Sequence, residues 1–94
     1  MAASEEGTRI QELMQGFLEA AYVRRNSYEW GVISMYSVCN DIGLDDRAIC
    51  KKIMNLHHHF GNITEVKGGP QIEEPSWFTL TPKGIAWVQR QRGG

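Results

Sequence analysis

Residues 34–60, SMYSVCNDIGLDDRAICKKIMNLHHHF, constrain the fold of this 94-residue chain more than any other segment. They predict two helices joined by a tight turn at Gly43-Leu44, because glycine most easily takes the positive φ that follows a helix. Ser34 is expected to cap the first of these helices and Asp45 the second. Apolar residues recur at helical spacing in both helices. The predicted apolar stripes are Met35, Val38, Cys39 and Ile42 in the first helix, and Ile49, Ile53, Leu56 and Phe60 in the second.

A further helix and an extended segment precede this pair. Thr8 and Gln11 resemble a capping box, so a helix is predicted from Thr8 to about Arg25. The acidic, polar residues 1–7 are expected to form a flexible tail and do not resemble a signal peptide. The aromatic and β-branched residues 28–33 indicate a short edge strand. One domain is predicted, over residues 8–92.

A hairpin and a last helix follow the pair. Residues 63–67 and 77–80 are rich in β-branched and aromatic residues and are predicted to form two strands of a hairpin. The proline- and glycine-rich residues 68–76 between them predict a loop. Thr81 and Pro82 have the residue types of a helix cap and a first helical position. The fold class expected is therefore α+β: mostly helical with a small antiparallel hairpin, in the order helix, strand, helix, helix, hairpin, helix.

Composition narrows the classes of function. The net charge is −1, with −2 over residues 1–33, 0 over residues 34–67 and +1 over residues 68–94. No apolar run approaches the roughly 20 residues that cross a bilayer, so no membrane partner is expected. Nothing signals export, so we expect a cytoplasmic protein with free thiols, although a disulfide between Cys39 and Cys50 stays open. No phosphate loop, metalloprotease motif or nucleophile elbow is present, which predicts neither an enzyme nor a cofactor.

The chain resembles the winged helix-turn-helix family in two motifs. Residues 78–84, FTLTPKG, resemble the aromatic-x-Leu-Thr-x-Lys-Gly ending of the wing, the family's name for its hairpin, in bacterial and archaeal repressors. Residues 39–44, CNDIGL, resemble the turn of the same proteins. The resemblance covers roughly residues 27–91. It implies a transcriptional regulator that places its third helix in the major groove of double-stranded DNA. Because one short helix buries little surface on DNA, we expect a homodimer. Its expected surface is the apolar side of the first and last helices, with Ile10, Leu13, Phe17, Trp87 and Val88.

The resemblance also implies which residues contact DNA. The positions expected to face the groove are Asp46, Arg47, Cys50, Lys51, Asn55 and His58. Arginine and lysine can bond to guanine, and asparagine to adenine. Lys52 and Lys67 are better suited to phosphate contacts. We expect weak or absent phosphate contacts from the rest of the wing, because its loop carries Glu73 and Glu74.

Two alternatives accompany this hypothesis. The near-neutral charge and acidic loop favour a protein-interaction module that contacts a partner through the wing or Trp77. The run His57-His58-His59 suggests a metal site, but consecutive helical residues point about 100° apart and cannot converge on one ion. No metal is therefore expected, and the histidines are predicted to be polar residues that meet the free carbonyls of the helix end.

Overall fold

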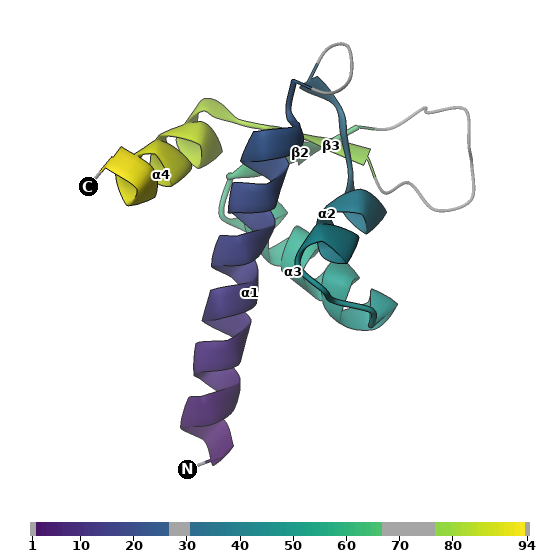
Figure 1. Cartoon of the computed structure of the whole chain (residues 1–94), viewed down its shortest axis with the longest axis vertical. Coiled ribbons are helices and arrows are strands. Elements are labelled where there is room, and N and C mark those ends of the chain that lie inside the picture. The colour runs from purple at the N-terminus through teal and green to yellow at the C-terminus, as the bar shows by residue number, and fades with distance from the viewer. Residues whose placement is uncertain (1, 27–30, 67–76, 94) are drawn as a thin grey trace.

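The order of helices and strands in the computed structural model follows the predicted one (Figure 1). The structure describes residues 2–26, 31–66 and 77–93, with side chains from Arg9 onward. The elements are α1 (Ala2–Arg24), β1 (Ile33–Ser34), α2 (Met35–Asp41), α3 (Arg47–His59), β2 (Ile63–Glu65), β3 (Trp77–Leu80) and α4 (Pro82–Gly93). The predicted α+β class is confirmed, since the described chain is mostly helical with a small antiparallel sheet.

The sheet has three strands in the order β1-β3-β2. β2 and β3 form the predicted antiparallel pair, with Thr64 opposite Thr79. Of the strand expected over residues 28–33, Gly31 and Val32 are described and lie outside any strand. β1 covers Ile33–Ser34 and pairs with the other edge of β3. Residues 28–30 lie outside the described part of the chain. β3 is therefore the central strand and joins the hairpin to the start of α2.

Aromatic rings fill the centre of the core. The ring of Phe17 on α1 stacks against Phe78 on β3, with centroids 5.2 Å apart, and against His57 on α3, with centroids 5.5 Å apart. Both phenylalanines are fully buried. Burying an aromatic or large aliphatic side chain contributes about 1.5–3 kcal/mol. The other buried apolar residues are Leu18, Ala21, Ile33, Met35, Val38, Cys39, Leu44, Cys50, Ile53, Met54, Ile63 and Val88.

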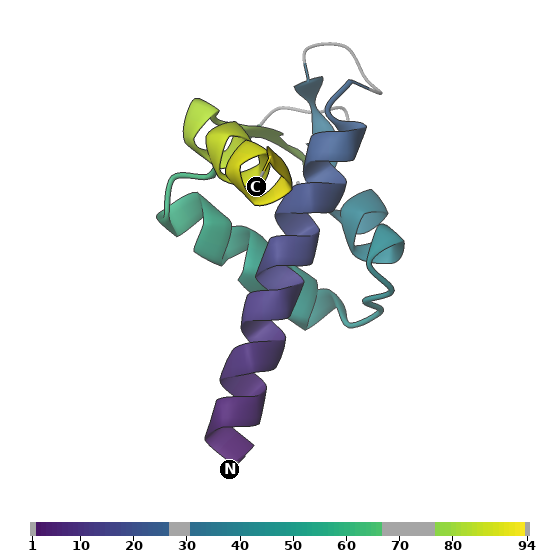
Figure 2. The same cartoon turned by 60° about the vertical axis from the view of Figure 1, so that its left-hand side comes forward.

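The first helix is longer than predicted. α1 begins at Ala2 rather than at Thr8, so the backbone of residues 2–7, predicted as a tail, is helical. Residues 2–6 are Ala, Ser and Glu, of which Ala and Glu favour the helix, and this explains why the helix continues past the expected cap. Figures 1 and 2 both show the N-terminal half of α1 extending beyond the rest of the protein.

The turn between α2 and α3 forms where predicted, but the residue that caps α3 differs from the predicted one. Gly43 has a φ of 72°, and the Leu44 amide donates to the carbonyl of Cys39 at 2.9 Å. The predicted cap Asp45 is wrong. Asp46 is the cap, because its carboxylate accepts from the amides of Ala48 and Ile49 at 2.9 and 3.3 Å. α3 consequently starts at Arg47.

The start of α4 is attached to the end of α3 and the residues that follow it. As predicted, Thr81 caps α4: its hydroxyl accepts from the Gly84 amide at 3.1 Å and donates to the carbonyl of Gly61 at 2.7 Å. The ammonium of Lys83 donates to the carbonyl of Phe60 at 2.7 Å. Gly84 lies so close to Asn62 that a Cβ there would meet the Asn62 carbonyl oxygen at 2.2 Å. The FTLTPKG motif therefore joins α4 to α3.

In the parts of the chain that the structure describes, no helix is both long enough and apolar enough to cross a membrane. Cys39 and Cys50 are free and buried. Burial of Cys39 confirms its predicted place in the apolar stripe of α2.

Candidate nucleic-acid interface

The exposed side of α3 is set by which residues the helix buries. The predicted stripe is only partly correct: Ile53 is buried, Ile49 and Leu56 are half-buried, and Phe60 is 48% exposed. The residues that α3 buries are Cys50, Ile53, Met54 and His57. At about 100° per residue, the buried face is turned by roughly 80° from the predicted one.

Five of the predicted contact residues lie on the exposed side of α3. They are Arg47, Lys51, Lys52, Asn55 and His58, and all five are exposed. Cys50 was also expected to face the groove, but this expectation is wrong: its side chain is 2% exposed and belongs to the core. Asp46 is exposed, but its carboxylate is occupied with the first amides of α3.

The charge of this side is positive. α3 contains one arginine and two lysines and has no Asp or Glu between Arg47 and His59. Among the side chains of residues 9–26, 31–66 and 77–93, Arg24 forms an ion pair with Asp41, and no acidic side chain pairs with Arg47, Lys51 or Lys52. An unpaired base keeps its full charge for a polyanion. We call the side chains of Arg47, Lys51, Lys52 and Asn55 the basic face.

An aromatic side chain of α2 orients the first residue of the basic face. The guanidinium carbon of Arg47 lies 5.0 Å from the ring centroid of Tyr36. Tyr36 is 37% exposed, and a cation–π contact at an exposed site contributes about 0.5–1 kcal/mol. Tyr36 was not among the predicted contact residues. The available signal was an aromatic residue on the polar side of the helix that precedes the turn.

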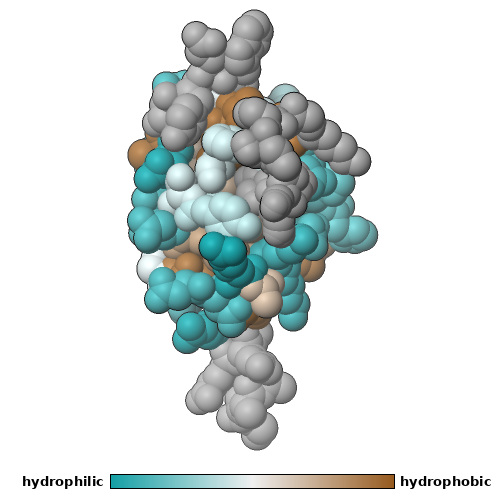
Figure 3. Space-filling view, turned by 90° about the vertical axis from the view of Figure 1, so that its right-hand side faces the viewer, coloured by the Kyte–Doolittle hydropathy of each residue, from teal (hydrophilic) through white to brown (hydrophobic). Residues whose placement is uncertain are grey.

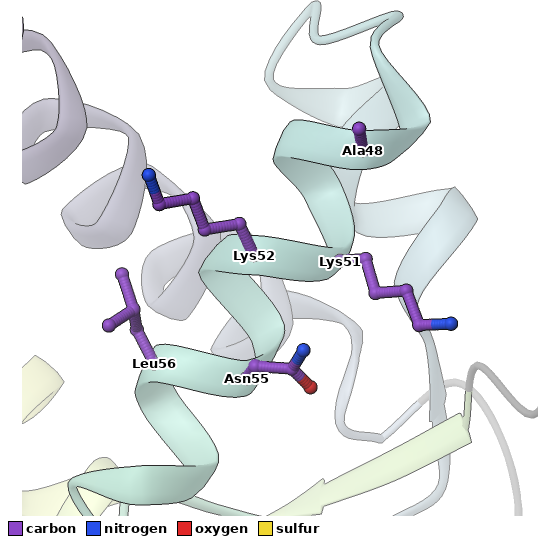
Figure 4. A pocket seen from close by; sticks show the side chains of 5 residues that line it. All are labelled: Ala48, Lys51, Lys52, Asn55 and Leu56. Atoms are coloured by element: carbon purple, nitrogen blue, oxygen red, sulfur yellow. The ribbon is translucent and has the colours of Figure 1, made fainter.

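The basic face is a helix surface rather than an enclosed cavity (Figure 4). A shallow depression there is lined by Ala48, Lys51, Lys52, Asn55 and Leu56, which all belong to α3. Lys51 and Lys52 point away from each other, to opposite sides of the helix. Sites for small molecules are usually concave and enclose most of the ligand. This geometry suits a large partner with a groove of its own.

Among the described residues, the side of the protein that lies to the right in Figure 1 is mostly hydrophilic (Figure 3). In Figure 3 its hydrophobic residues form small separate patches among polar ones. A large contiguous apolar patch would indicate a protein or membrane contact, and the described residues on this side do not form one in Figure 3.

The three histidines differ from one another. His57 was predicted to be a polar residue at the helix end, but this is wrong, because it is buried between α1 and α3. Its Nε2 lies 2.9 Å from the Met14 carbonyl and its Nδ1 lies 3.0 Å from the Asn62 amide nitrogen. His58 and His59 are exposed. No group of three or more His, Cys, Asp or Glu among the described residues could hold a metal ion.

Lys67 and the acidic loop with Glu73 and Glu74 fall outside the described residues. Lys83 bonds to the carbonyl of Phe60 and so serves the junction between α3 and α4. The basic face therefore consists of side chains from α3.

Comparison with protein-family models, curated proteins and solved structures found no match to this chain.

Proposed function

We propose that this protein is a winged helix-turn-helix domain that binds double-stranded DNA and regulates transcription. The order of its elements, the α2-turn-α3 unit and the hairpin support the proposal. The observation that carries it is the basic face, whose three cationic side chains are exposed and without a salt bridge in the described residues. The FTLTPKG resemblance adds support at the hairpin, although the described contacts of this motif are structural.

The dimensions of α3 fit the major groove. Its 13 residues give a length of about 20 Å, and the groove is about 12 Å wide. In the proposed complex Arg47 and Lys51 read guanine, Asn55 reads adenine, and His58 lies close to the same bases. Lys52 points to the other side of α3 from Lys51 (Figure 4), and it contacts phosphate.

The proposed dimer uses α1 and α4, with a smaller set of residues than expected. Phe17 and Val88 were candidates for its surface, but both are fully buried in the protomer's own core. Ile10, Leu13 and Trp87 are half-buried and remain candidates. Two copies would roughly double the surface that a single recognition helix buries on DNA.

A specific observation favours the alternative of a protein-interaction module. Phe60 is 48% exposed at the end of α3, next to the half-buried Leu56. Aromatic anchors of this kind often carry the affinity of protein interfaces. The net charge of −1 is also lower than that of many dedicated DNA-binding domains.

Salt dependence of duplex binding separates the two proposals. A labelled, mixed-sequence duplex is titrated with the protein at low and at moderate salt. A DNA-binding protein should associate with a logarithmic salt slope of about −0.9 for each phosphate it neutralises. Lys52→Ala should reduce this slope by about one unit. Absence of association at low salt would contradict DNA binding and favour the interaction module.

A further inference from the structure

The two cysteines of the chain lie together at the contact between α2 and α3. Cys39 belongs to α2 and Cys50 to α3, and each is 2% exposed. Leu44 in the turn connects them: its amide donates to the carbonyl of Cys39 at 2.9 Å, and its carbonyl lies 3.9 Å from the Sγ of Cys50. Residues eleven positions apart in the sequence therefore share one site in the core.

The two thiols lie near each other in the core. Each cysteine contacts Leu44, and the neighbouring Cys50 thiol helps to raise the pKa of the Cys39 thiol. A disulfide requires Cβ atoms about 3.5–4.5 Å apart. Because both cysteines adjoin Leu44 in the turn between the two packed helices, a rearrangement of this contact can bring their side chains to this separation.

We propose that Cys39 and Cys50 form an intramolecular disulfide that joins α2 to α3 when the protein meets a low-molecular-weight disulfide. One thiol loses its proton, attacks the small disulfide and releases one reduced small thiol, which leaves a mixed disulfide on the protein. The second cysteine then attacks the protein sulfur of that mixed disulfide and releases the second small thiol. Two electrons and two protons pass from the cysteine pair to the oxidant.

Burial makes this reaction slow. It raises the pKa of the Cys39 thiol, and the neighbouring Cys50 thiol raises it further. Because the thiolate is the reactive form, the folded pair stays reduced until the contact between α2 and α3 opens transiently. Once formed, the disulfide is shielded from reductants by the same burial.

The bond would fix the two helices that form the α2-turn-α3 unit. It closes a loop of twelve residues, from Cys39 to Cys50. Closing a loop of this size restricts the unfolded chain and raises the midpoint of thermal unfolding by roughly 10 °C for a domain of this length. This inference does not depend on DNA binding.

Oxidised glutathione tests the proposal on the wild-type protein. The protein is incubated with it in dilute urea, which allows the contact between α2 and α3 to open. The intact mass should fall by two hydrogens without gain of glutathione. Trypsin cuts after Arg25, Arg47 and Lys51, so the disulfide should join the peptide of residues 26–47 to that of residues 48–51. The thermal midpoint should rise and return when reductant is added.

Cys39→Ala and Cys50→Ala are the matched controls. Each should lack the linked peptides and show no increase in thermal midpoint with oxidant, whether or not it is less stable than wild type. The comparison of oxidised with reduced wild type needs neither variant to fold. Two free thiols after treatment, glutathione adducts alone, links only between two protein molecules, or a lower midpoint of the linked form would each overturn the proposal.

Discussion

The side-chain amide of Asn62 donates a hydrogen bond to Nδ1 of His57 at 3.0 Å. The Nε2 atom of His57 faces the carbonyl of Met14, which can only accept, so this nitrogen carries the proton and the ring is neutral. The carbonyl of Asn62 accepts from the amide of Thr81 at 3.0 Å. This pair therefore connects α1, the end of α3 and the start of α4.

Stability should depend on the charge of His57. Burial lowers the pKa of its imidazole below the ordinary value of 6.5, partly opposed by the bond to Met14. The unfolded chain then binds a proton more readily than the folded one, so stability is present above about pH 6.5 and falls as pH decreases toward the folded pKa. Denaturant unfolding between about pH 8 and about pH 5 measures this loss.

Two variants test whether His57 causes this pH dependence of stability. His57→Gln should lower stability and remove most of the pH dependence in this window, whereas His58→Gln, at an exposed position, should keep it. Arg24 holds the pKa of the Asp41 carboxyl below its ordinary value of 3.8. Protonation of Asp41 therefore affects stability only at a pH below this window. Equal pH dependence of the two variants would contradict the role given to His57.

Gly84→Ala should destabilise the fold by at least about 2 kcal/mol. The new Cβ would lie 2.2 Å from the Asn62 carbonyl oxygen, which is backbone and cannot move away cheaply. Gly93→Ala is the control in the same helix, since nothing lies within 4 Å of a Cβ there, and it should change stability by less than about 0.5 kcal/mol. Thermal unfolding compares them, and similar midpoints would mean that α4 does not approach Asn62 this closely.

The adjacent aspartates before α3 should differ in their contributions. Asp46→Ala should cost about 1 kcal/mol, because it removes the acceptor for the amides of Ala48 and Ile49. Asp45→Ala should change stability by less than about 0.5 kcal/mol, although it removes the same charge. Urea unfolding of both variants measures the difference. A larger loss for Asp45→Ala would assign the cap to the other residue.

The sequence predicted the order of the elements because its turns carry strong local signals. Gly43 specifies a helix end through its positive φ, and Thr81-Pro82 specify a helix start through a capping hydroxyl and the fixed φ of proline. It could not choose between two adjacent aspartates as the cap of α3, since either residue type suits that position.

The buried face of α3 was predicted about 80° away from its observed position for a different reason. The prediction treated His57 as polar and therefore exposed. In the structure both of its ring nitrogens have hydrogen-bond partners, from α1 and from the residues after α3, which permits its burial. Those partners are 43 and 5 positions away in the sequence, and hydropathy patterns do not contain such contacts. The exposure of Arg47, Lys51 and Asn55 was nevertheless predicted correctly, because charged and amide groups are rarely buried unpaired.

Removing one cation from the basic face tests the proposed function most directly. A preferred duplex is first selected from a random library, and its affinity is then measured for wild type, Arg47→Ala and Arg90→Ala. Arg90 is an exposed arginine of α4, so its variant loses the same charge away from α3. Arg47→Ala should bind the duplex about 1–3 kcal/mol more weakly, with Arg90→Ala within about 0.5 kcal/mol of wild type. A library that yields no preferred duplex, or equal binding by wild type and Arg47→Ala, would contradict recognition of DNA by α3.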